Sequence, residues 1–279
     1  MYYFLIKEVI HIDENIVIDE YLNGSSTVKL GDKYGVRPST IRNILIRNNI
    51  KLRSNKVNSR KYQVNENAFE NIETEEQAYW LGFLYADGFV TNHNSKKIGI
   101  TLAERDKGHL CKFNSYLNSN YPIKTYVQTA GYAVGKNYCR LMITSEKMYD
   151  DLVKYGVVEH KTYALEYPDF LPDNLQWHFL RGYCDGDGCI THNGNSYAVK
   201  IMCVESFAAK LIKFLEQSIE GFYCSYKARK TDCETKSLNL FGKSAYQFIN
   251  NTYSNNSISL DRKNAIAISS LEYFSRLYQ

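Results

Sequence analysis

The sequence predicts an α+β protein in which a small all-α domain precedes two copies of a helix-and-strand unit. Three observations lead to this prediction. Two apolar segments that end in Asp-Gly, WLGFLYADG (80–88) and LRGYCDGDG (180–188), occur 100 residues apart. Further matches follow each segment in the same order, which indicates an internal duplication. A basic stretch with two short helical patterns precedes both copies.

Residues 1–62 are expected to form a helix-turn-helix domain followed by a basic linker. In STVKLGDKYGVRPSTIRNILI, Gly35 is placed to take a left-handed turn between two helices. Ser39, directly after Pro38, is placed to cap the second helix. The apolar positions expected to face the domain core are Val28, Leu30 and Tyr34 in the first helix and Ile41, Ile44 and Leu45 in the second.

The same region carries a concentration of positive charge. Residues 29–61 contain ten basic residues and one acid, a local net charge of +9 against +4 for the whole chain. Such a block points to a polyanionic partner, although a solvated charged face is the alternative. YGVRPSTIRNILI resembles the helix-turn-helix of resolvases and phage regulators, in which Arg and Asn suit base edges. The expected DNA contacts here are Arg37, Ser39, Arg42, Asn43 and Arg47.

Residues 63–170 and 171–279 are expected to be two repeats of one fold. ITLAERDKGHLCKF (100–113) aligns with IMCVESFAAKLIKF (201–214), and LMITSEKMYDDL (141–152) aligns with LNLFGKSAYQFI (238–249). EHKTYAL (159–165) then aligns with LDRKNAI (260–266), which matches Lys161 to Lys263. The patterns in each repeat indicate an apolar helix, a strand, a helix, two strands and a helix.

The apolar helices that open the repeats are expected to pack against each other, side by side and parallel. Gly82 and Ala86 share one helix face, as do Gly182 and Gly186, and small residues at this spacing allow two helix backbones to approach closely. Gly88 and Gly188 are then expected to end the helices in a left-handed cap, a conformation that glycine adopts readily.

This packing would bring Asp87 and Asp187 together at two helix C-termini. A carboxylate is unfavourable at the negative end of a helix dipole, and two neighbouring carboxylates require a raised pKa or a cation. Carboxylates beside exposed backbone carbonyls form an all-oxygen site that suits Mg²⁺ or Mn²⁺. The alternative is that each Asp-Gly only ends a helix. A calcium loop is excluded because its downstream carboxylate is missing.

WLGFLYADG and LRGYCDGDG resemble the paired signature of the LAGLIDADG homing endonucleases, in their two-motif, single-chain form, over about residues 76–268. The resemblance implies a duplicated αββαββα fold with pseudo-twofold symmetry and concave antiparallel sheets. It implies that Asp87 and Asp187 hold the metal ions, that the carbonyls of Ala86 and Gly186 add ligands, and that Lys161 and Lys263 are the active-site lysines. The motif's earlier acid is kept as Asp185 but replaced by Tyr85, at a position that is not a metal ligand.

The function implied by this resemblance is metal-dependent, sequence-specific cleavage of double-stranded DNA by a monomer, typical of intron homing. The strands KTYVQT (124–129) and SYKARKT (225–231) fit the DNA-facing surface. Their expected contacts are Lys124, Gln128, Lys227 and Arg229. A non-cleaving protein of this fold, acting as an intron RNA maturase or a regulator, is the main alternative. A ligand-sensing regulator is less consistent with two matched acids.

The composition excludes several other classes of protein. The seven cysteines are odd in number and contain no C-x-x-C pair, so neither a disulfide framework nor a zinc site is expected. No apolar stretch approaches the roughly 18 residues that span a bilayer, and the charged residues near the start of the chain lead us to expect no signal peptide there. We expect a soluble intracellular protein without a small-molecule cofactor.

Overall fold

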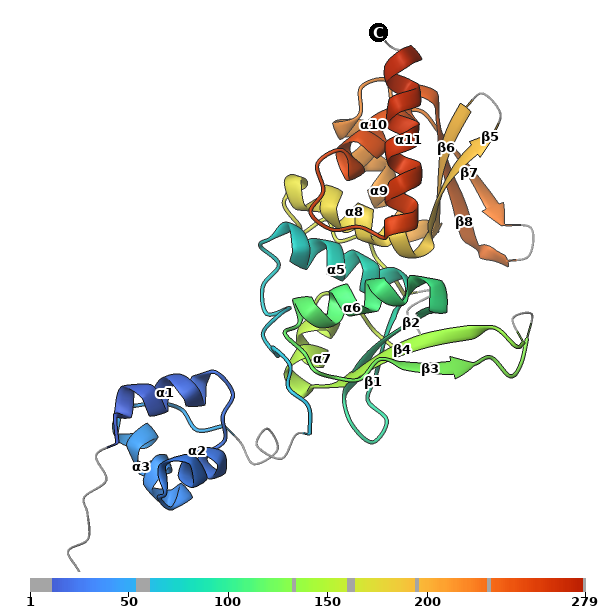
Figure 1. The fold of residues 1–279 in the computed structure, drawn as a ribbon. Helices are drawn as coiled ribbons and strands as arrows, with labels where there is room; N and C mark the ends of the chain where they lie inside the picture. Colours follow the sequence, from blue (N-terminus) through green and yellow to red (C-terminus); the bar gives the residue numbers. More distant parts are fainter. Residues whose placement is uncertain are drawn as a thin grey trace, which may run out of the picture. The chain divides into compact units, whose positions relative to one another are not determined.

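The computed structural model describes residues 12–53, 61–131, 134–159, 164–193, 196–229 and 232–277. The chain divides into two compact units, Met1–Gln63 and Val64–Gln279, which are described separately (Figure 1). None of the helices within the described ranges has the length and apolar character needed to cross a membrane.

The N-terminal unit is built from three helices, α1 (Glu14–Leu22), α2 (Thr27–Tyr34) and α3 (Pro38–Arg47). Asp13 caps α1 and Ser26 caps α2, and Gly35 takes the predicted left-handed conformation (φ 65°) that separates α2 from α3. Each helix contributes to one small core, which contains Val17, Tyr21, Leu30, Ile41, Ile44 and Leu45.

Three details of this unit differ from the sequence prediction. Helix α1 was not predicted, because its apolar residues show little one-sided periodicity. Val28 is 55% exposed, so the buried face of α2 runs through Leu30 and Gly31. Ser39 does not cap α3: Arg37 is the N-cap residue, and Pro38 occupies the first turn, where its missing N–H is not needed.

The larger unit contains two repeats of the order αββαββα, as the family resemblance predicted. The first comprises α5 (Glu75–Ala86), β1 (Gly88–Thr91), β2 (Lys97–Ala103), η1 (Glu104–Asp106), α6 (Lys107–Tyr116), β3 (Lys124–Val127), β4 (Asn137–Thr144) and α7 (Glu146–Lys154). The second comprises α8 (Asp173–Asp187), β5 (Gly188–Asn193), β6 (Ser196–Val204), α9 (Glu205–Ser218), β7 (Cys224–Arg229), β8 (Asp232–Phe241) and α10 (Gly242–Tyr253), and α11 (Asp261–Leu277) follows it. The residue patterns alone had missed β1 and β5.

Each repeat forms a four-stranded antiparallel sheet, with strand orders β1-β2-β4-β3 and β5-β6-β8-β7. The strand pairing supports the sequence alignment of the repeats, because residues matched by the alignment occupy the same place in the two ladders. The equivalent pairs are Gly88–Ile100 with Gly188–Ile201, Ile100–Leu141 with Ile201–Leu238, and Ile98–Ile143 with Val199–Leu240.

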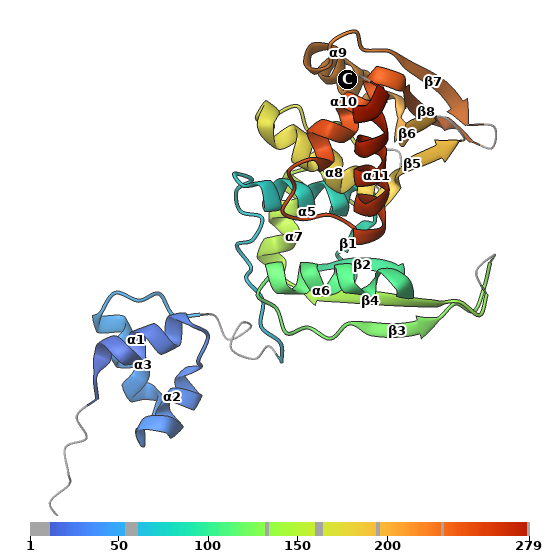
Figure 2. The same ribbon diagram turned by 45° about the horizontal axis from the view of Figure 1, so that its top comes forward.

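Helices cover one face of each sheet, as the two views in Figures 1 and 2 show. In β2 the residues that alternate onto this covered face, Ile98, Ile100 and Leu102, are buried. Residues of the opposite face, such as Lys97 and Thr101, are only half-buried. We call this second surface the outer face of each sheet.

The seam between the repeats is formed by α5 and α8, which run in the same direction. A Cβ atom on Gly82 would lie 2.0 Å from the carbonyl oxygen of Phe179, and one on Gly182 would lie 1.9 Å from that of Tyr79. Only glycine permits this approach, as the small-residue spacing predicted.

The predicted left-handed caps after these helices are wrong. Gly188 is extended (φ −88°, ψ 167°), and Gly88 is not among the glycines with positive φ. Each chain passes directly from helix into strand here. Glycine is needed for space instead, because a Cβ would lie 2.7 Å from the Cα of Leu84 or of Cys184.

Candidate catalytic site and nucleic-acid interface

The two motif aspartates lie where the paired helices end. Asp87 directly follows α5, and Asp187 is the last residue of α8. A Cβ on Gly186 would lie 2.2 Å from the Cβ of Ala86 and 3.4 Å from the carboxyl carbon of Asp87. The carboxyl group of Asp87 therefore lies beside the last turn of α8, next to the residue that precedes Asp187. Asp87 is half-buried and Asp187 is exposed, so the second carboxylate is the more accessible one.

Lys263, from the first turn of α11, crosses to the C-terminal end of α8. Its ammonium group donates to the carbonyl oxygens of Cys184 (2.6 Å), Gly186 (3.3 Å) and Gly188 (2.7 Å). A cation is favourable at this negative helix end. Burial lowers the pKa of Lys263, while the nearby carboxylates of Asp185 and Asp87 act in the opposite direction. All three donors of the predicted catalytic lysine are thus directed at backbone carbonyls.

Asp185 points away from Asp187 into the core between the repeats. Its buried carboxylate accepts hydrogen bonds from the hydroxyls of Tyr79 (2.7 Å) and Tyr253 (2.8 Å) and from the backbone N–H of Leu260 (2.6 Å). Burial raises the pKa of Asp185, and these three donors lower it. Leu260 directly precedes α11, so Asp185 fixes the start of the helix that carries Lys263.

The first repeat has a different arrangement at the matching position. The hydroxyl of Tyr85 donates to the carbonyl oxygen of Tyr155, and burial raises the pKa of Tyr85. Gly156 has φ +93°, and a Cβ there would lie 2.5 Å from the Tyr85 hydroxyl. The replacement of the acid by tyrosine is therefore accommodated by a glycine turn after α7. Lys161, the predicted partner of Lys263, lies outside the described residues and stays a prediction.

A buried arginine joins the other end of the seam. Arg181, 1% exposed, donates to Glu75 Oε1 across the two helices (2.7 Å) and to the carbonyl oxygens of Thr252 (2.9 Å) and Ile258 (2.8 Å). Arg181 was not among the residues predicted from the sequence. A charged side chain inside the apolar run FLRGYC (179–184) was the available signal, because buried arginines require several hydrogen-bond partners.

The donor chemistry at the helix ends fits a hard divalent cation. Two carboxylates and the terminal carbonyls of Ala86 and Gly186 provide only oxygen atoms, which Mg²⁺ and Mn²⁺ prefer. In the part of the chain that the structure describes, no group of three or more His, Cys, Asp or Glu side chains could hold a metal. Further ligands would have to come from water or from substrate phosphate oxygens.

Comparison with solved structures identifies the fold. No protein-family model and no curated protein matches the chain. The homing endonuclease I-WcaI bound to its DNA recognition sequence matches 78% of this chain and 96% of its own, with 13% identity and a TM-score of 0.52. The chain has the LAGLIDADG fold. I-SmaMI bound to an uncleaved DNA target (12% identity, 74% of this chain, 98% of that one, TM-score 0.43) is also similar. The N-terminal LAGLIDADG domain of a DUF199/WhiA protein is similar as well, with 19% identity and a TM-score of 0.44 over 72% of this chain and 93% of that one.

The outer faces of the two LAGLIDADG sheets carry two of the predicted DNA-contacting lysines at equivalent positions. Lys124 pairs with Arg140 of β4, and Lys227 pairs with Ser237 at the matching place in β8. Both lysines are exposed. Gln128 is half-buried and donates to the carbonyl oxygen of Ala130 (2.9 Å). The side chain of Arg229 lies outside the described part of the structure.

In the N-terminal unit, all five predicted DNA contacts are exposed: Arg37, Ser39, Arg42, Asn43 and Arg47. Arg47 also forms an ion pair with Glu14, which ties the end of α3 to the start of α1. Its side chain therefore has a structural partner within this unit, whereas no partner for Arg42 occurs among the described residues.

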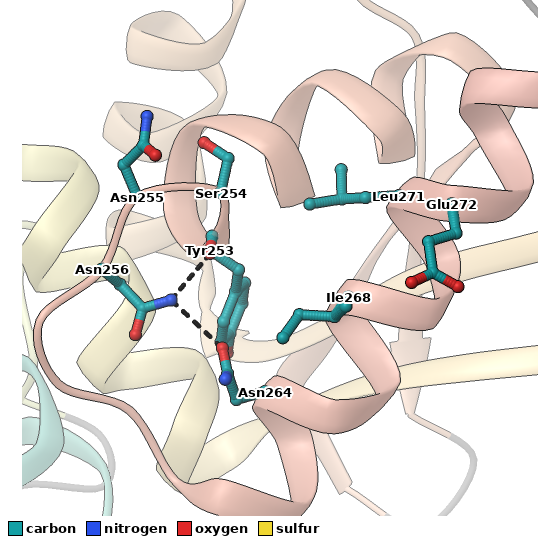
Figure 3. Close-up of a pocket in the computed structure, with 8 residues that line it drawn as sticks. All are labelled: Tyr253, Ser254, Asn255, Asn256, Asn264, Ile268, Leu271 and Glu272. Atoms are coloured by element: carbon teal, nitrogen blue, oxygen red, sulfur yellow. Dashed lines mark hydrogen bonds between the residues drawn. The ribbon is translucent and has the colours of Figure 1, made fainter.

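A pocket of about 520 Å³ lies between α11 and the end of α10 with the residues that follow it (Figure 3). Asn256 donates across its rim to the carbonyl oxygen of Tyr253 (2.7 Å) and to Asn264 (3.1 Å). None of the predicted catalytic or DNA-binding residues lines this pocket. Its lining contains three amide side chains and one charged side chain, that of Glu272. The pocket therefore differs in chemistry from the paired ends of α5 and α8, which carry two aspartates.

Proposed function

We propose that this protein is a sequence-specific endonuclease that hydrolyses phosphodiester bonds of double-stranded DNA with Mg²⁺ or Mn²⁺. The observation that carries the proposal is the convergence of Asp87 and the last turn of α8, which ends in Asp187. Two carboxylates at adjoining helix C-termini repel each other and the negative helix ends, which destabilises the folded protein. A cation bound between the helix ends would offset this repulsion.

In this proposal Asp87 and Asp187, with the carbonyls of Ala86 and Gly186, hold the divalent ions. When bound, such ions lower the pKa of a water molecule and stabilise charge on the phosphate and the leaving oxygen. Each repeat supplies one carboxylate, which gives one hydrolytic centre for each DNA strand. The exposed Asp187 and half-buried Asp87 then differ in how readily substrate and solvent reach them.

Lys263 acts in this proposal mainly by orienting the end of α8. Its contact with the Gly186 carbonyl leaves that oxygen a second lone pair for a metal ion. The Asp87 carboxylate lies close enough to Lys263 to act against the lowering of the pKa of that lysine by burial. We also propose that Lys161 is the active-site lysine of the first repeat.

The substrate is proposed to lie along the outer faces of both sheets. I-WcaI, which shares the fold, is bound to its DNA recognition sequence. Lys124 and Lys227 occupy matching positions in the two sheets, as expected for two related half-sites. We further propose that the basic N-terminal unit contacts DNA through α3 and that the protein acts as a monomer, because one chain already contains both repeats.

A cleavage selection tests the proposal. The purified protein is incubated with a randomised duplex library in Mg²⁺ and, in parallel, in EDTA, and the cut ends are sequenced. Cuts in both strands at one long site, seen only with Mg²⁺, are the expected result. Tight and selective binding without cuts in Mg²⁺ or Mn²⁺ would instead support a non-cleaving maturase or regulator.

A further inference from the structure

The outer face of the first sheet carries an arginine surrounded by aromatic rings. The guanidinium carbon of Arg140, in β4, lies 5.7 Å from the ring centres of Tyr126 and Tyr138 and 5.8 Å from that of Phe89. The two tyrosine rings stack on each other with centres 5.3 Å apart. We call these four residues the Arg140 cluster. Because arginine is attracted to aromatic faces, the three rings restrict the guanidinium to a narrow range of positions.

One edge of this guanidinium is already used within the sheet. Arg140 Nε donates to Thr101 Oγ1 of the neighbouring strand (2.9 Å). The aromatic contacts involve the positive charge of the guanidinium and leave its remaining N–H groups available as donors. Neither Nη1 nor Nη2 has a hydrogen-bond partner among the residues that the structure describes. Arg140 thus presents a pair of parallel donors on the outer face of the first sheet, where none of the described strand residues is acidic.

The second sheet shows that the fold does not require this cluster. Ser237 occupies the place of Arg140, since it lies between Met202 and Lys227 as Arg140 lies between Thr101 and Lys124. Cys189, paired with Lys200, occupies the place of Phe89, which is paired with Gly99.

Gly99 is part of the same arrangement. A Cβ at this position would lie 2.3 Å from the Phe89 ring, so the ring lies across the glycine. The second sheet folds with the same topology without the arginine, the overlying ring or the glycine. These side chains are therefore better explained by a ligand than by folding.

We infer that Arg140 reads a guanine in the half of the DNA site that the first sheet covers. Two parallel donors match O6 and N7 of guanine in the major groove, and a two-stranded ribbon such as β3–β4 fits that groove. The second sheet has only a serine at the equivalent position, so the matching base pair of the other half-site lacks this requirement. This inference rests on the proposed function, because it assumes that DNA lies on the outer faces of the sheets.

A binding selection tests the inference without using cleavage. Randomised duplex DNA and randomised single-stranded DNA are each selected in EDTA with the full-length wild-type protein and with Arg140→Ala, Arg140→Lys and Lys124→Ala. The wild type is expected to enrich duplexes with a guanine at one fixed position. Arg140→Ala should reduce the preference for this guanine on the order of ten- to a hundredfold and leave other positions unchanged.

The other variants separate base recognition from charge and from folding. Arg140→Lys keeps the charge but not the paired donors, so it should retain most of the overall affinity and lose the guanine preference. Lys124→Ala, the neighbouring cation, should weaken binding to all sequences alike. The inference would be overturned if Arg140→Ala kept the guanine preference, or if both Arg140 variants lost affinity equally for all sequences. It would also be overturned if the wild-type protein preferred single-stranded DNA, whose bases could stack on the aromatic rings. Failure of the wild type to cut DNA in Mg²⁺ while this pattern holds would overturn only the nuclease proposal.

Discussion

The backbone of Gly182 in α8 lies directly against that of Tyr79 in α5, since a Cβ atom on Gly182 would be 1.9 Å from the carbonyl oxygen of Tyr79. The relationship is reciprocal, because Gly82 makes the same approach to Phe179. Backbone atoms cannot rotate aside as a side chain can. The distance between the two helices, and therefore the placement of Asp87 and Asp187 at their ends, depends on these two glycines.

Gly182→Ala is expected to lower the free energy of unfolding by about 3 kcal/mol, because an added methyl group forces the two helix backbones apart. Urea unfolding at pH 7.5 measures the change. Gly108→Ala is the matched control, since it also lies in a helix but a Cβ there would have no atom within 4 Å. The control should be neutral or more stable by up to about 1 kcal/mol. Equal losses in both variants would contradict the steric argument.

Asp187→Asn and Asp87→Asn are each expected to reduce double-strand cleavage on the order of a hundredfold or more, because the amide cannot replace a carboxylate as a ligand and charge. Binding to the same duplex should be largely retained, since neither residue lies on the outer face of a sheet. Cleavage and filter-binding assays on one selected duplex separate the two effects. Cutting at the wild-type rate by either variant would remove that residue from the proposed metal site.

The N-terminal unit offers a matched pair of arginines on one helix. Arg42→Ala should weaken DNA binding and lower the slope of log affinity against log salt by about 0.9 if the arginine contacts one phosphate. The reason is that each neutralised phosphate releases counterions. Arg47 already pairs with Glu14, so Arg47→Ala should affect the stability of this unit more than the salt slope. Identical salt slopes for wild type and Arg42→Ala would count against a phosphate contact at this residue.

Several features were predictable because they depend on local pattern or on comparison of the repeats. The matches of Ile100 to Ile201 and Leu141 to Leu238 anticipated equivalent positions in the two ladders. The small residues of α5 and α8 anticipated their close packing.

Other features depend on contacts between distant segments, which one sequence does not display. Asp185 receives hydrogen bonds from residues 79, 253 and 260, and Arg181 reaches residues 75, 252 and 258. The strand β1 has only four residues, too few for a clear alternation. The Arg140 cluster combines three strands, so it becomes visible only once the register is known.

Lys263→Met is expected to lower the free energy of unfolding by about 3 kcal/mol, since it removes the three charged hydrogen bonds that the lysine donates to carbonyl oxygens at the end of α8. Methionine is close in size to the aliphatic part of lysine and lacks the ammonium group with its donors and charge. Lys210→Met is the control, because Lys210 forms exposed ion pairs with Glu166 and Asp169 that contribute little to stability. Thermal and urea unfolding of both variants provide the measurement. A Lys263→Met protein as stable as the control would show that the lysine does not support the helix end.

The buried ring of His109 is expected to make the stability of the protein depend on pH. Burial lowers the pKa of this histidine to about 3, with a further contribution from Lys112, whereas the ring in an unfolded chain titrates near 6.5. Because the unfolded chain binds a proton that the native ring does not, stability falls as the pH drops below 6.5. Between pH 7.5 and pH 5 this loss amounts to about 2 kcal/mol.

Glutamine keeps an N–H donor for the Tyr79 hydroxyl, 3.0 Å from His109 Nε2, and does not titrate. His109→Gln should therefore lose about 2 kcal/mol less than the wild type over this range in urea unfolding. His93→Gln, at an exposed position, should follow the wild type. Parallel curves for wild type and His109→Gln would show that the ring is not held neutral.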